Sequence, residues 1–245
     1  SECLVGSEMC IRDRLDSWTN GQLNPAYYQD YATYFVKWVQ AFNAEGIDIY
    51  AVTPQNEPLN RGNSASLYMS WEEQRDFVKT ALGPKFKTAG LATKIYAYDH
   101  NYDYSDIATE KNYPGKMYED AAASQYLAGA AYHNYGGNRE ELLNIHKAYP
   151  EKELLFTETS IGTWNSGRDL SKRLLEDMKE VALGTINNWC RGVIVWNLML
   201  DNDRAPNREG GCQTCYGAVD ISNSDYKTII RNSHYYIPVS YTHLT

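Results

Sequence analysis

Apolar residues recur along the chain with two different spacings, and the two spacings alternate. Short, almost wholly apolar runs lie near residues 49–53, 94–98, 127–132, 153–157 and 193–200. The segments at 25–45, 71–89, 113–124, 138–149 and 169–189 have the length and the end residues of helices. Continuous apolar runs are typical of strands that are covered on both faces. The alternation therefore predicts an α/β fold built on a parallel sheet.

Polar side chains follow the apolar runs, at the point where each predicted strand ends. They are Asn56 and Glu57, then Asp99, His100 and Asn101, then His133 and Tyr135, then Glu158, and Asn197 in the last run. In a (β/α)₈ TIM barrel the site is built from the carboxyl ends of several strands. A doubly wound sheet would instead gather its chemistry at one switch point. Polar ends on five successive strands therefore favour the barrel.

Two of these polar residues are glutamates that end buried runs. Glu57 closes the stretch 49–58 (IYAVTPQNEP), and Glu158 closes 153–158 (ELLFTE). A single glutamate at a strand end is usually a solvated loop residue or lies near a helix cap. A pair of carboxylates, however, is the group that splits glycosidic bonds. Together the two residues favour a catalytic site.

Composition excludes several other classes of protein. Among 245 residues, Lys and Arg number 23 against 31 Asp and Glu, so the formal net charge is −8. Since no basic stripe is present, we expect neither nucleic acid nor an anionic membrane surface as a partner. No apolar run approaches the length of a transmembrane helix. No G-x-G-x-x-G or P-loop opens a helix, so no nucleotide cofactor is expected.

Metal and thiol chemistry have weak support. His133 with Asp99 is a conceivable metal-ligand pair, but no H-x-H or H-E-x-x-H spacing accompanies it. We therefore expect neither a metal nor any other cofactor. Cys212 and Cys215 form a single C-x-x-C, which fits a short-loop disulfide or two free thiols better than zinc.

The two ends of the chain differ from the rest. Residues 1–14 (SECLVGSEMCIRDR) show no clear period, and Pro238 interrupts a helix-like run that ends at Ile237. Residues 1–14 and 238–245 both resemble translated adaptor sequence, so we expect them to be non-native. Residues 15–237 then form the domain whose fold is of interest.

Six segments in order carry a resemblance to a known family. They are AVTPQNEP (51–58), AYDHNYD (97–103), AYHNYGG (131–137), FTETSIGTW (156–164), VWNLMLD (195–201) and GCQTCYGAVDIS (211–222). The chain resembles glycoside hydrolase family 30 over residues 15–237. The resemblance implies a retaining β-glycosidase in which Glu57 is the acid/base and Glu158 the nucleophile. Apolar surroundings and the like charge of Glu158 would raise the pKa of Glu57, so we expect Glu57 to keep its proton.

The same resemblance implies sugar-binding roles for other residues. Asn56 would contact the sugar 2-hydroxyl, His133 and Tyr135 would line the sugar site, and Trp196 would form a platform beneath the sugar. Asp99, His100 and Asn101 either bind sugar hydroxyls or fix the loop that follows. Trp164 is either a further platform or loop packing.

The C-x-x-C segment and the Asp-His-Asn strand end most resemble the β-1,6-glucanases of the family. Glucosylceramidase and xylanase relatives are the close alternatives, and a non-catalytic carbohydrate-binding barrel is an alternative of another class. The expected partner is a β-linked glucan or glucoside. We expect a secreted, periplasmic or cell-surface protein.

The resemblance also implies that part of the barrel is missing. Counted back from Glu57, the first predicted strand matches the fourth strand of the family's barrel. Strands one to three and the flanking β-sandwich would then lie outside this chain. We therefore expect the 245 residues alone to be inactive and poorly folded.

Overall fold

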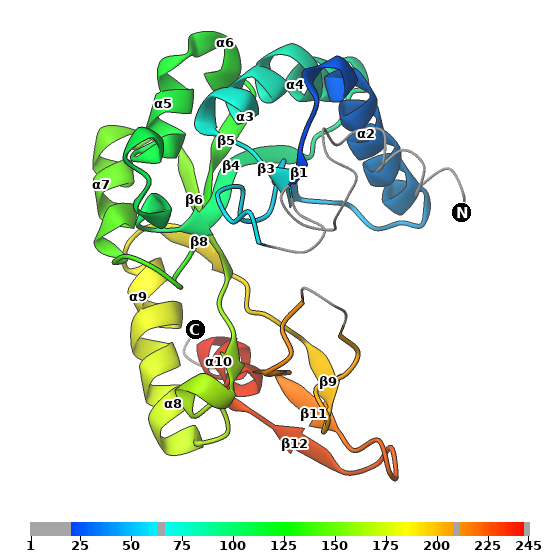
Figure 1. Ribbon diagram of the computed structural model, residues 1–245, viewed down its shortest axis with the longest axis vertical. Helices are drawn as coiled ribbons and strands as arrows, with labels where there is room; N and C mark the ends of the chain where they lie inside the picture. Colours follow the sequence, from blue (N-terminus) through cyan, green and yellow to red (C-terminus); the bar gives the residue numbers. More distant parts are fainter. Residues whose placement is uncertain (1–20, 63–66, 208–210, 243–245) are drawn as a thin grey trace.

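A five-stranded parallel sheet forms the centre of the computed structural model, which describes residues 21–62, 67–207 and 211–242. The strand order is β2-β4-β5-β6-β8, and every neighbouring pair is parallel (Figure 1). The strands are β2 (Ala51–Val52), β4 (Lys94–Asn101), β5 (Leu127–His133), β6 (Glu153–Glu158) and β8 (Cys190–Val193). This is a parallel half-barrel, which confirms the predicted incomplete (β/α)₈ fold.

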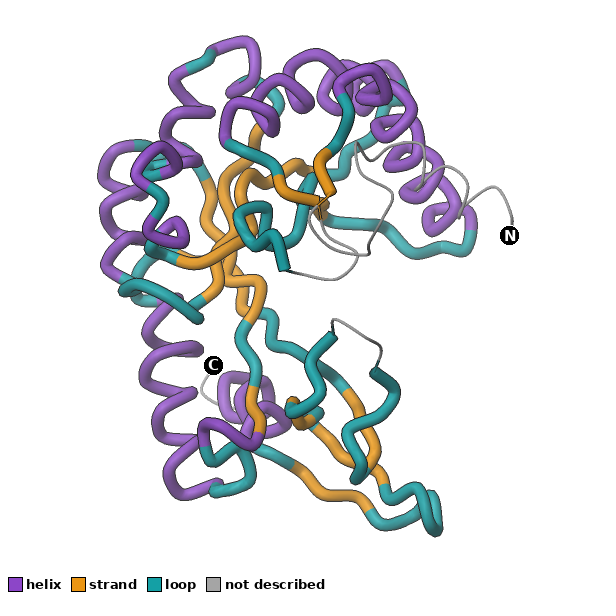
Figure 2. Tube along the Cα trace, in the orientation of Figure 1, coloured by secondary structure: helices purple, strands orange, loops and turns teal. Residues whose placement is uncertain are grey.

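Helices form a layer along the outside of the curved sheet (Figure 2). They are α2 (Tyr28–Ala44), α3 (Trp71–Phe77), α4 (Gly83–Thr88), α5 (Tyr113–Glu119), α6 (Ala121–Ser124), α7 (Glu140–Ala148), α8 (Leu170–Glu176) and α9 (Leu183–Ile186). Short π-helical segments, Val78–Leu82 and Asp177–Ala182, join α3 to α4 and α8 to α9. Each predicted helix is therefore present at its expected position.

The local sequence explains how these elements begin and pack. Ser70 caps α3 through a capping box with Glu73, as its position before an acidic first turn predicts. β4 is buried along almost its whole length. Its Tyr96 and Tyr98 are fully buried, as is Phe156 of β6. Burial on both faces is the reason that these strands read as continuous apolar runs.

The last apolar run, 193–200, is only partly a strand of this sheet, so the prediction was wrong in its second half. β8 ends at Val193, and Ile194 and Leu198 are 58% and 78% exposed. The backbone changes partners there: the carbonyl of Asn197 accepts from Ala218 N, at 2.8 Å. The run then continues as β9 (Met199–Asp201) in a second sheet.

A second sheet lies in the lower half of the molecule in Figure 1, and two short ribbons lie outside both sheets. β9 pairs in parallel with β11 (Val219–Ile221), which pairs antiparallel with β12 (Ile229–Arg231). The ribbons are β7 (Ile161–Gly162) with β10 (Cys215–Tyr216) and β1 (Gly21–Gln22) with β3 (Leu67–Tyr68). The 3₁₀ turns are Pro25–Tyr27, Tyr104–Asp106, Ala108–Glu110 and Thr163–Asn165.

Cys212 and Cys215 form a disulfide at the start of β10, which resolves the two alternatives left by the sequence. The last helix, α10 (Ser233–Thr242), continues past Ile237, where a break was expected at Pro238. The predicted non-native origin of 238–245 stays a prediction, and that of 1–14 lies outside the described residues. No helix in the described part of the chain is long and apolar enough to cross a membrane.

The two outer strands of the central sheet lead to a prediction about the chain by itself. In this sheet β2 pairs only with β4, and β8 only with β6, among the described residues. Unpaired strand edges are templates for association. We expect the isolated 245-residue chain to associate, and Ile194→Lys at the β8 edge to raise its soluble monomer fraction at least about twofold. Sedimentation velocity measures both.

Leu175→Lys provides the matched control, because Leu175 is 72% exposed on α8 and lies away from the sheet edges. It should leave the monomer fraction unchanged. A soluble wild-type monomer with a cooperative melt would contradict the prediction.

Candidate active site

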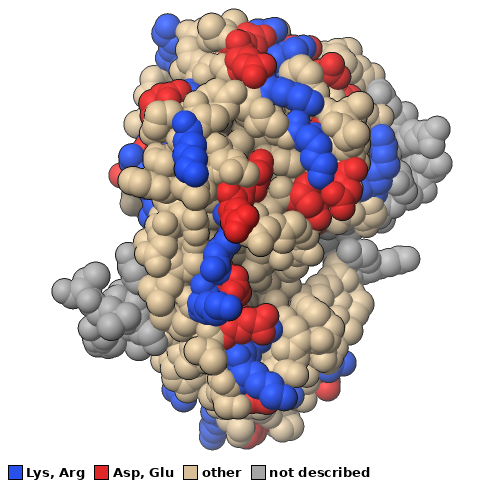
Figure 3. Space-filling model, turned by 90° about the vertical axis from the view of Figure 1, so that its left-hand side faces the viewer, with Lys and Arg blue, Asp and Glu red and all other residues tan. Residues whose placement is uncertain are grey.

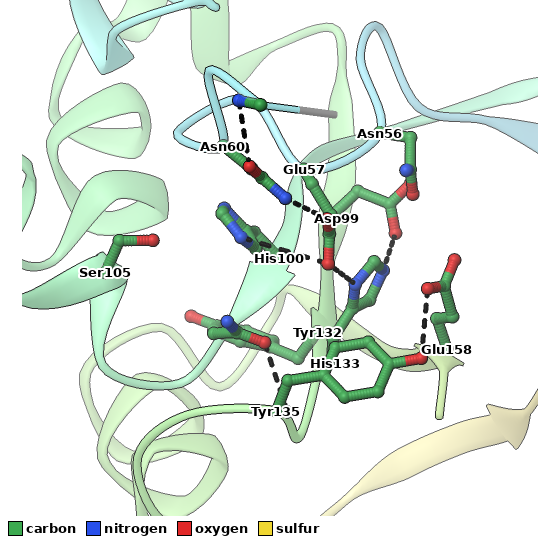
Figure 4. A network of polar contacts seen from close by, with 12 residues as sticks. Asn56, Glu57, Asn60, Asp99, His100, Ser105, Tyr132, His133, Tyr135 and Glu158 are labelled. Atoms are coloured by element: carbon green, nitrogen blue, oxygen red, sulfur yellow. Dashed lines mark hydrogen bonds and ion pairs between the residues drawn. The ribbon is translucent and has the colours of Figure 1, made fainter. Parts of the chain in front are cut away.

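Glu57 and Glu158 face each other at the carboxyl ends of β2 and β6 (Figure 4). A carboxylate oxygen of Glu57, one of Glu158 and a ring nitrogen of His133 all lie within 4.8 Å of one another. Carboxyl groups about 5–5.5 Å apart are typical of retaining glycosidases, whereas inverting enzymes need about 6.5–9.5 Å to admit a water. The spacing therefore suits direct attack by one carboxylate.

The turn after β2 fixes the Glu57 carboxylate. Glu57 adopts a left-handed backbone conformation, with φ 46°, and its N–H donates to the carbonyl of Asp99 at 2.9 Å. The amide of Asn60 donates to Glu57 Oε2 at 2.8 Å. The residue is only 8% exposed. A non-glycine residue held at positive φ is common at functional sites, where surrounding contacts maintain the strain.

Asp99 is a buried carboxylate that lies behind Glu57. It accepts hydrogen bonds from Thr53 Oγ1 at 2.6 Å, Thr157 Oγ1 at 2.5 Å and His133 Nε2 at 3.0 Å. Burial by itself would raise its pKa, but the hydrogen bond and charge of His133 and the two threonine hydroxyls lower it. Asp99 is therefore ionised.

His133 lies between Asp99 and Glu57. Its Nδ1 is 3.4 Å from Glu57 Oε1, and the residue is 1% exposed. Burial opposes a charge on the ring, but the hydrogen bonds to Asp99 and Glu57 prevail and raise the pKa of His133 to about 9. The ring is therefore an imidazolium at neutral pH and donates from both nitrogens.

His100 is on the other side of Glu57 and has the opposite ionisation. Its Nε2 is 3.9 Å from Glu57 Oε1, and its Nδ1 has no hydrogen-bond partner among the described residues. Burial lowers the pKa of His100 to about 4, despite the nearby Glu57 carboxylate. His100 is therefore neutral near pH 7.

The pKa values of the two glutamates reverse the expectation from the sequence. Burial would raise the pKa of Glu57, but the hydrogen bonds of His133 and Asn60 and the nearby His100 lower it. Burial raises the pKa of Glu158, and the charge of Glu57 adds to this against the influence of His133 and Tyr135. The prediction of a raised pKa for Glu57 was wrong because it counted apolar surroundings and omitted these donors.

Tyr135 contacts the second carboxylate. Its hydroxyl donates to Glu158 Oε1 at 3.1 Å and lies 2.9 Å from the hydroxyl of Ser160. Its backbone N–H donates to Asn101 Oδ1 at 3.1 Å. Asn101 thus holds the loop after β5 that carries Tyr135, a contact different from the expected one with the loop that follows β4.

Two cavities meet at Glu57 and Tyr135. The first, of about 670 Å³, is lined by the carboxylate pair with Asn56, Ser160, Trp164, Trp196 and Asn197, among others. The indoles of Trp164 and Trp196 are about half exposed and available to stack on a ligand. The second cavity, of about 560 Å³, is lined by Asn60, Arg61, Tyr68, His100 and Asn101, among others. An elongated ligand can therefore pass Glu57 on both sides.

The structure brings together the residues predicted from the sequence, with one difference in placement. Asn56, Tyr135, Trp164 and Trp196 line the first cavity, and His100 and Asn101 line the second. His133, which was expected to line the sugar site, and Asp99, for which sugar binding was one of two expected roles, line neither cavity. Both are buried behind Glu57. There His133 contacts two carboxylates, and Asp99 contacts His133 and two threonine hydroxyls.

Sequence reasoning missed Thr53, Asn60, Thr157 and Ser160. A signal for two of them exists, since each glutamate-bearing segment has a threonine at its strand end, Thr53 and Thr157.

On the face drawn in Figure 3, basic and acidic side chains are interspersed rather than gathered into a basic stripe.

Comparison with known proteins places these features in a family. Residues 15–236 match the model described as the glycosyl hydrolase family 30 TIM-barrel domain. The endo-1,6-beta-D-glucanase BGN16.3 of Trichoderma harzianum is 35% identical over 234 residues, 89% of this chain and 44% of that protein. Putative glucosylceramidase 4 of Caenorhabditis elegans is 28% identical, over 76% of this chain and 37% of that protein.

A solved structure is similar to most of the described chain. The endo-beta1,6-glucanase BT3312 has 90% sequence identity and a TM-score of 0.89, over 91% of this chain and 49% of that one. The chain thus spans about half the length of the relatives that it matches.

The ionisation of His133 leads to a prediction about stability. A pKa raised from 6.5 to about 9 contributes stability that is complete below pH 6.5 and is lost as pH rises through 9. At about 1.4 kcal/mol per pKa unit, this is on the order of 3 kcal/mol. In a protein of the relatives' full length, we expect His133→Gln to lower the free energy of unfolding more at pH 6 than at pH 9.5. Urea unfolding at both pH values measures this.

His100→Gln is the control, since a pKa lowered to about 4 links His100 to stability only below pH 6.5. Between pH 6 and pH 9.5 its effect should change by less than about 1 kcal/mol and in the opposite sense, with the smaller loss of stability at pH 6. An equal effect of His133→Gln at both would contradict the charged state of His133.

Proposed function

The chain belongs to glycosyl hydrolase family 30, and we propose that it carries the catalytic carboxylates of a retaining β-glycosidase that hydrolyses β-1,6-glucan. The observation that supports this most directly is the spacing of Glu57 and Glu158, whose nearest ligand oxygens lie within 4.8 Å. This spacing is shorter than the separation of about 6.5–9.5 Å at which inverting enzymes admit a water between substrate and base. The activity is proposed for a protein of the relatives' full length.

In the first step Glu158 attacks the anomeric carbon, and the bond from that carbon to the leaving oxygen breaks. Glu57 gives a proton to that oxygen. In the second step Glu57 takes a proton from water, the water oxygen attacks the anomeric carbon, and the bond to Glu158 breaks. The hydrogen bond from Tyr135 orients the Glu158 carboxylate for both steps.

The two cavities give the substrate its direction. The cavity that contains Glu158 and the two tryptophans would hold the sugar whose anomeric carbon reacts. The cavity beyond Glu57, with Asn60, His100 and Asn101, would hold the leaving sugar. Because both are open, we propose cleavage within a chain rather than only at its end.

The β-1,6 linkage is proposed from the relatives. The Trichoderma harzianum protein and the solved structure quoted above are named as endo-1,6-β-glucanases, and the putative glucosylceramidase is less similar to this chain. A polymeric substrate and the disulfide Cys212–Cys215 both favour a compartment outside the cytoplasm. We therefore retain a secreted, periplasmic or cell-surface location as part of the proposal.

Removal of each carboxylate tests the roles separately. Glu158→Gln should lower kcat on β-1,6-glucan at least about 10³-fold, since loss of a nucleophile in other hydrolases costs up to about 10⁶. With an aryl glycoside and azide, Glu158→Gly should form an α-glycosyl azide, because azide attacks from the side of the missing nucleophile. Glu57→Gly should form a β-glycosyl azide, because azide replaces water on the glycosyl-enzyme.

NMR of the azide products and of the wild-type sugar product measures these outcomes. Exchanged azide anomers would reverse the two roles. A wild-type product with inverted anomeric configuration would overturn the retaining mechanism.

Substrate preference is tested on two polysaccharides and one glycolipid in parallel. We expect kcat/KM of the full-length protein to be at least about tenfold higher on β-1,6-glucan than on xylan or glucosylceramide, equivalent to about 1.4 kcal/mol in transition-state binding. Release of reducing sugar or ceramide gives the rates. A preference for xylan or glucosylceramide would overturn the linkage while leaving the carboxylate chemistry in place.

A further inference from the structure

We propose that Asp99, His133 and Glu57 form one proton-holding unit, in which His133 stores the proton that Glu57 delivers to the leaving oxygen. In this unit His133 and Asp99 are positioning residues, because they act through Glu57 and not on the sugar. The inference deepens the proposed function and rests on it. It also explains how a glutamate whose surroundings favour the ionised form can serve as an acid.

The geometry places the three groups in a row (Figure 4). Asp99 Oδ1 is 3.0 Å from His133 Nε2, and His133 Nδ1 is 3.4 Å from Glu57 Oε1. Asp99 is 7% exposed, His133 1% and Glu57 8%, so the whole row is largely shielded from water. A contact of 3.4 Å is long for a hydrogen bond, but such contacts often tighten when substrate binds.

The charges around His133 come from several elements. Asp99 and the neutral His100 lie on β4, Glu57 follows β2, Glu158 ends β6, and Tyr135 lies beyond β5. Three carboxylates thus surround one imidazole. The ring donates its hydrogen bonds to two of them, Asp99 and Glu57. A proton that enters this cluster is therefore held first by His133.

Asp99 keeps the arrangement fixed while the proton moves. Its carboxylate accepts from Thr53 and Thr157 as well as from His133 Nε2, so it stays ionised and holds that ring nitrogen in its protonated form. The Nδ1 nitrogen of His133 then faces Glu57 in either protonation state. It can give a proton to Glu57 or accept one from it.

The transfer balances as follows. The Nδ1–H bond of His133 breaks and an O–H bond forms on Glu57 Oε1, so that an imidazolium and a carboxylate become a neutral imidazole and a carboxylic acid. Glu57 then passes this proton to the glycosidic oxygen as the bond to the anomeric carbon breaks. In the second step Glu57 removes a proton from the attacking water and returns it to His133 Nδ1. The net charge of the unit is restored after one turnover.

The pH dependence of kcat/KM provides the test in the full-length protein. Loss of activity at high pH should follow loss of the proton held by His133, near the value of about 9. His133→Gln removes this store, and Asp99→Asn removes the anion that retains the proton. In both variants we expect the basic limb of the profile to move down by about one pH unit or more.

The leaving group separates proton delivery from a structural effect. With an aryl glycoside whose phenol leaves without a proton, we expect both variants to keep most of their kcat. On β-1,6-glucan we expect a loss of about 10²-fold, the usual contribution of general acid catalysis. Equal losses on both substrates, or a basic limb that does not move, would overturn the inference.

His100→Gln is the matched control, because His100 lies 3.9 Å from the same Glu57 oxygen but is neutral above its pKa of about 4. Its basic limb should stay at the wild-type pH, and a shift equal to that of His133→Gln would overturn the relay.

¹⁵N NMR of the histidines gives a readout without substrate. His133 should show two N–H groups at neutral pH, and a neutral ring there would overturn the relay. If His133 is charged but the wild-type protein cleaves no β-glycoside, the proposed function fails rather than the ionisation of the unit.

Discussion

A buried carboxylate has to be hydrogen-bonded on both oxygens, and in this fold that constraint applies to Asp99. An unpaired charge at this depth would cost several kcal/mol. Asp99 meets the requirement with Thr53, His133 and Thr157, while its backbone carbonyl accepts from Glu57. These residues come from, or directly follow, four strands that are adjacent in the sheet. Satisfying one charge therefore aligns the four strand ends on which the candidate site is built.

The same constraint determines how charge is distributed over the site. A cluster of three carboxylates needs a cation, and the imidazolium of His133 is the cation in contact with it. Its hydrogen bonds go to Asp99 and Glu57, while Glu158 receives a hydrogen bond from Tyr135. This difference in partners, rather than a difference in burial, separates the ionisation of the two glutamates. As a result, the proton of the site would be held on His133, one residue behind Glu57, which would deliver it to the substrate.

Sequence reasoning predicted most of the fold because the signal for it is local. The apolar runs, the capping box at Ser70 and the two strand-ending glutamates can all be read within ten residues. The ionisation of Glu57 could not be predicted, because it depends on His133, which is 76 residues away along the chain. The run 193–200 was misread for a related reason. Its apolar composition predicts a strand of the central sheet, but the backbone carbonyls of Asn197 and Leu198 accept from Ala218 and from Val219 at the start of β11.

The placement of two successive β4 residues beside Glu57 requires an irregular strand. In a regular strand, neighbouring side chains point to opposite faces of the sheet, so Asp99 could not contact His133 while His100 approaches Glu57 from the same strand. The pairing of β4 with β5 shifts register between Tyr98 and His100, and both Tyr98 and Asp99 have positive φ, 74° and 76°. A bulge of this kind turns an extra side chain toward the same side. The strained backbone at the end of β4 therefore places the charged pair of Asp99 and His133 on one side of Glu57 and the neutral His100 on the other.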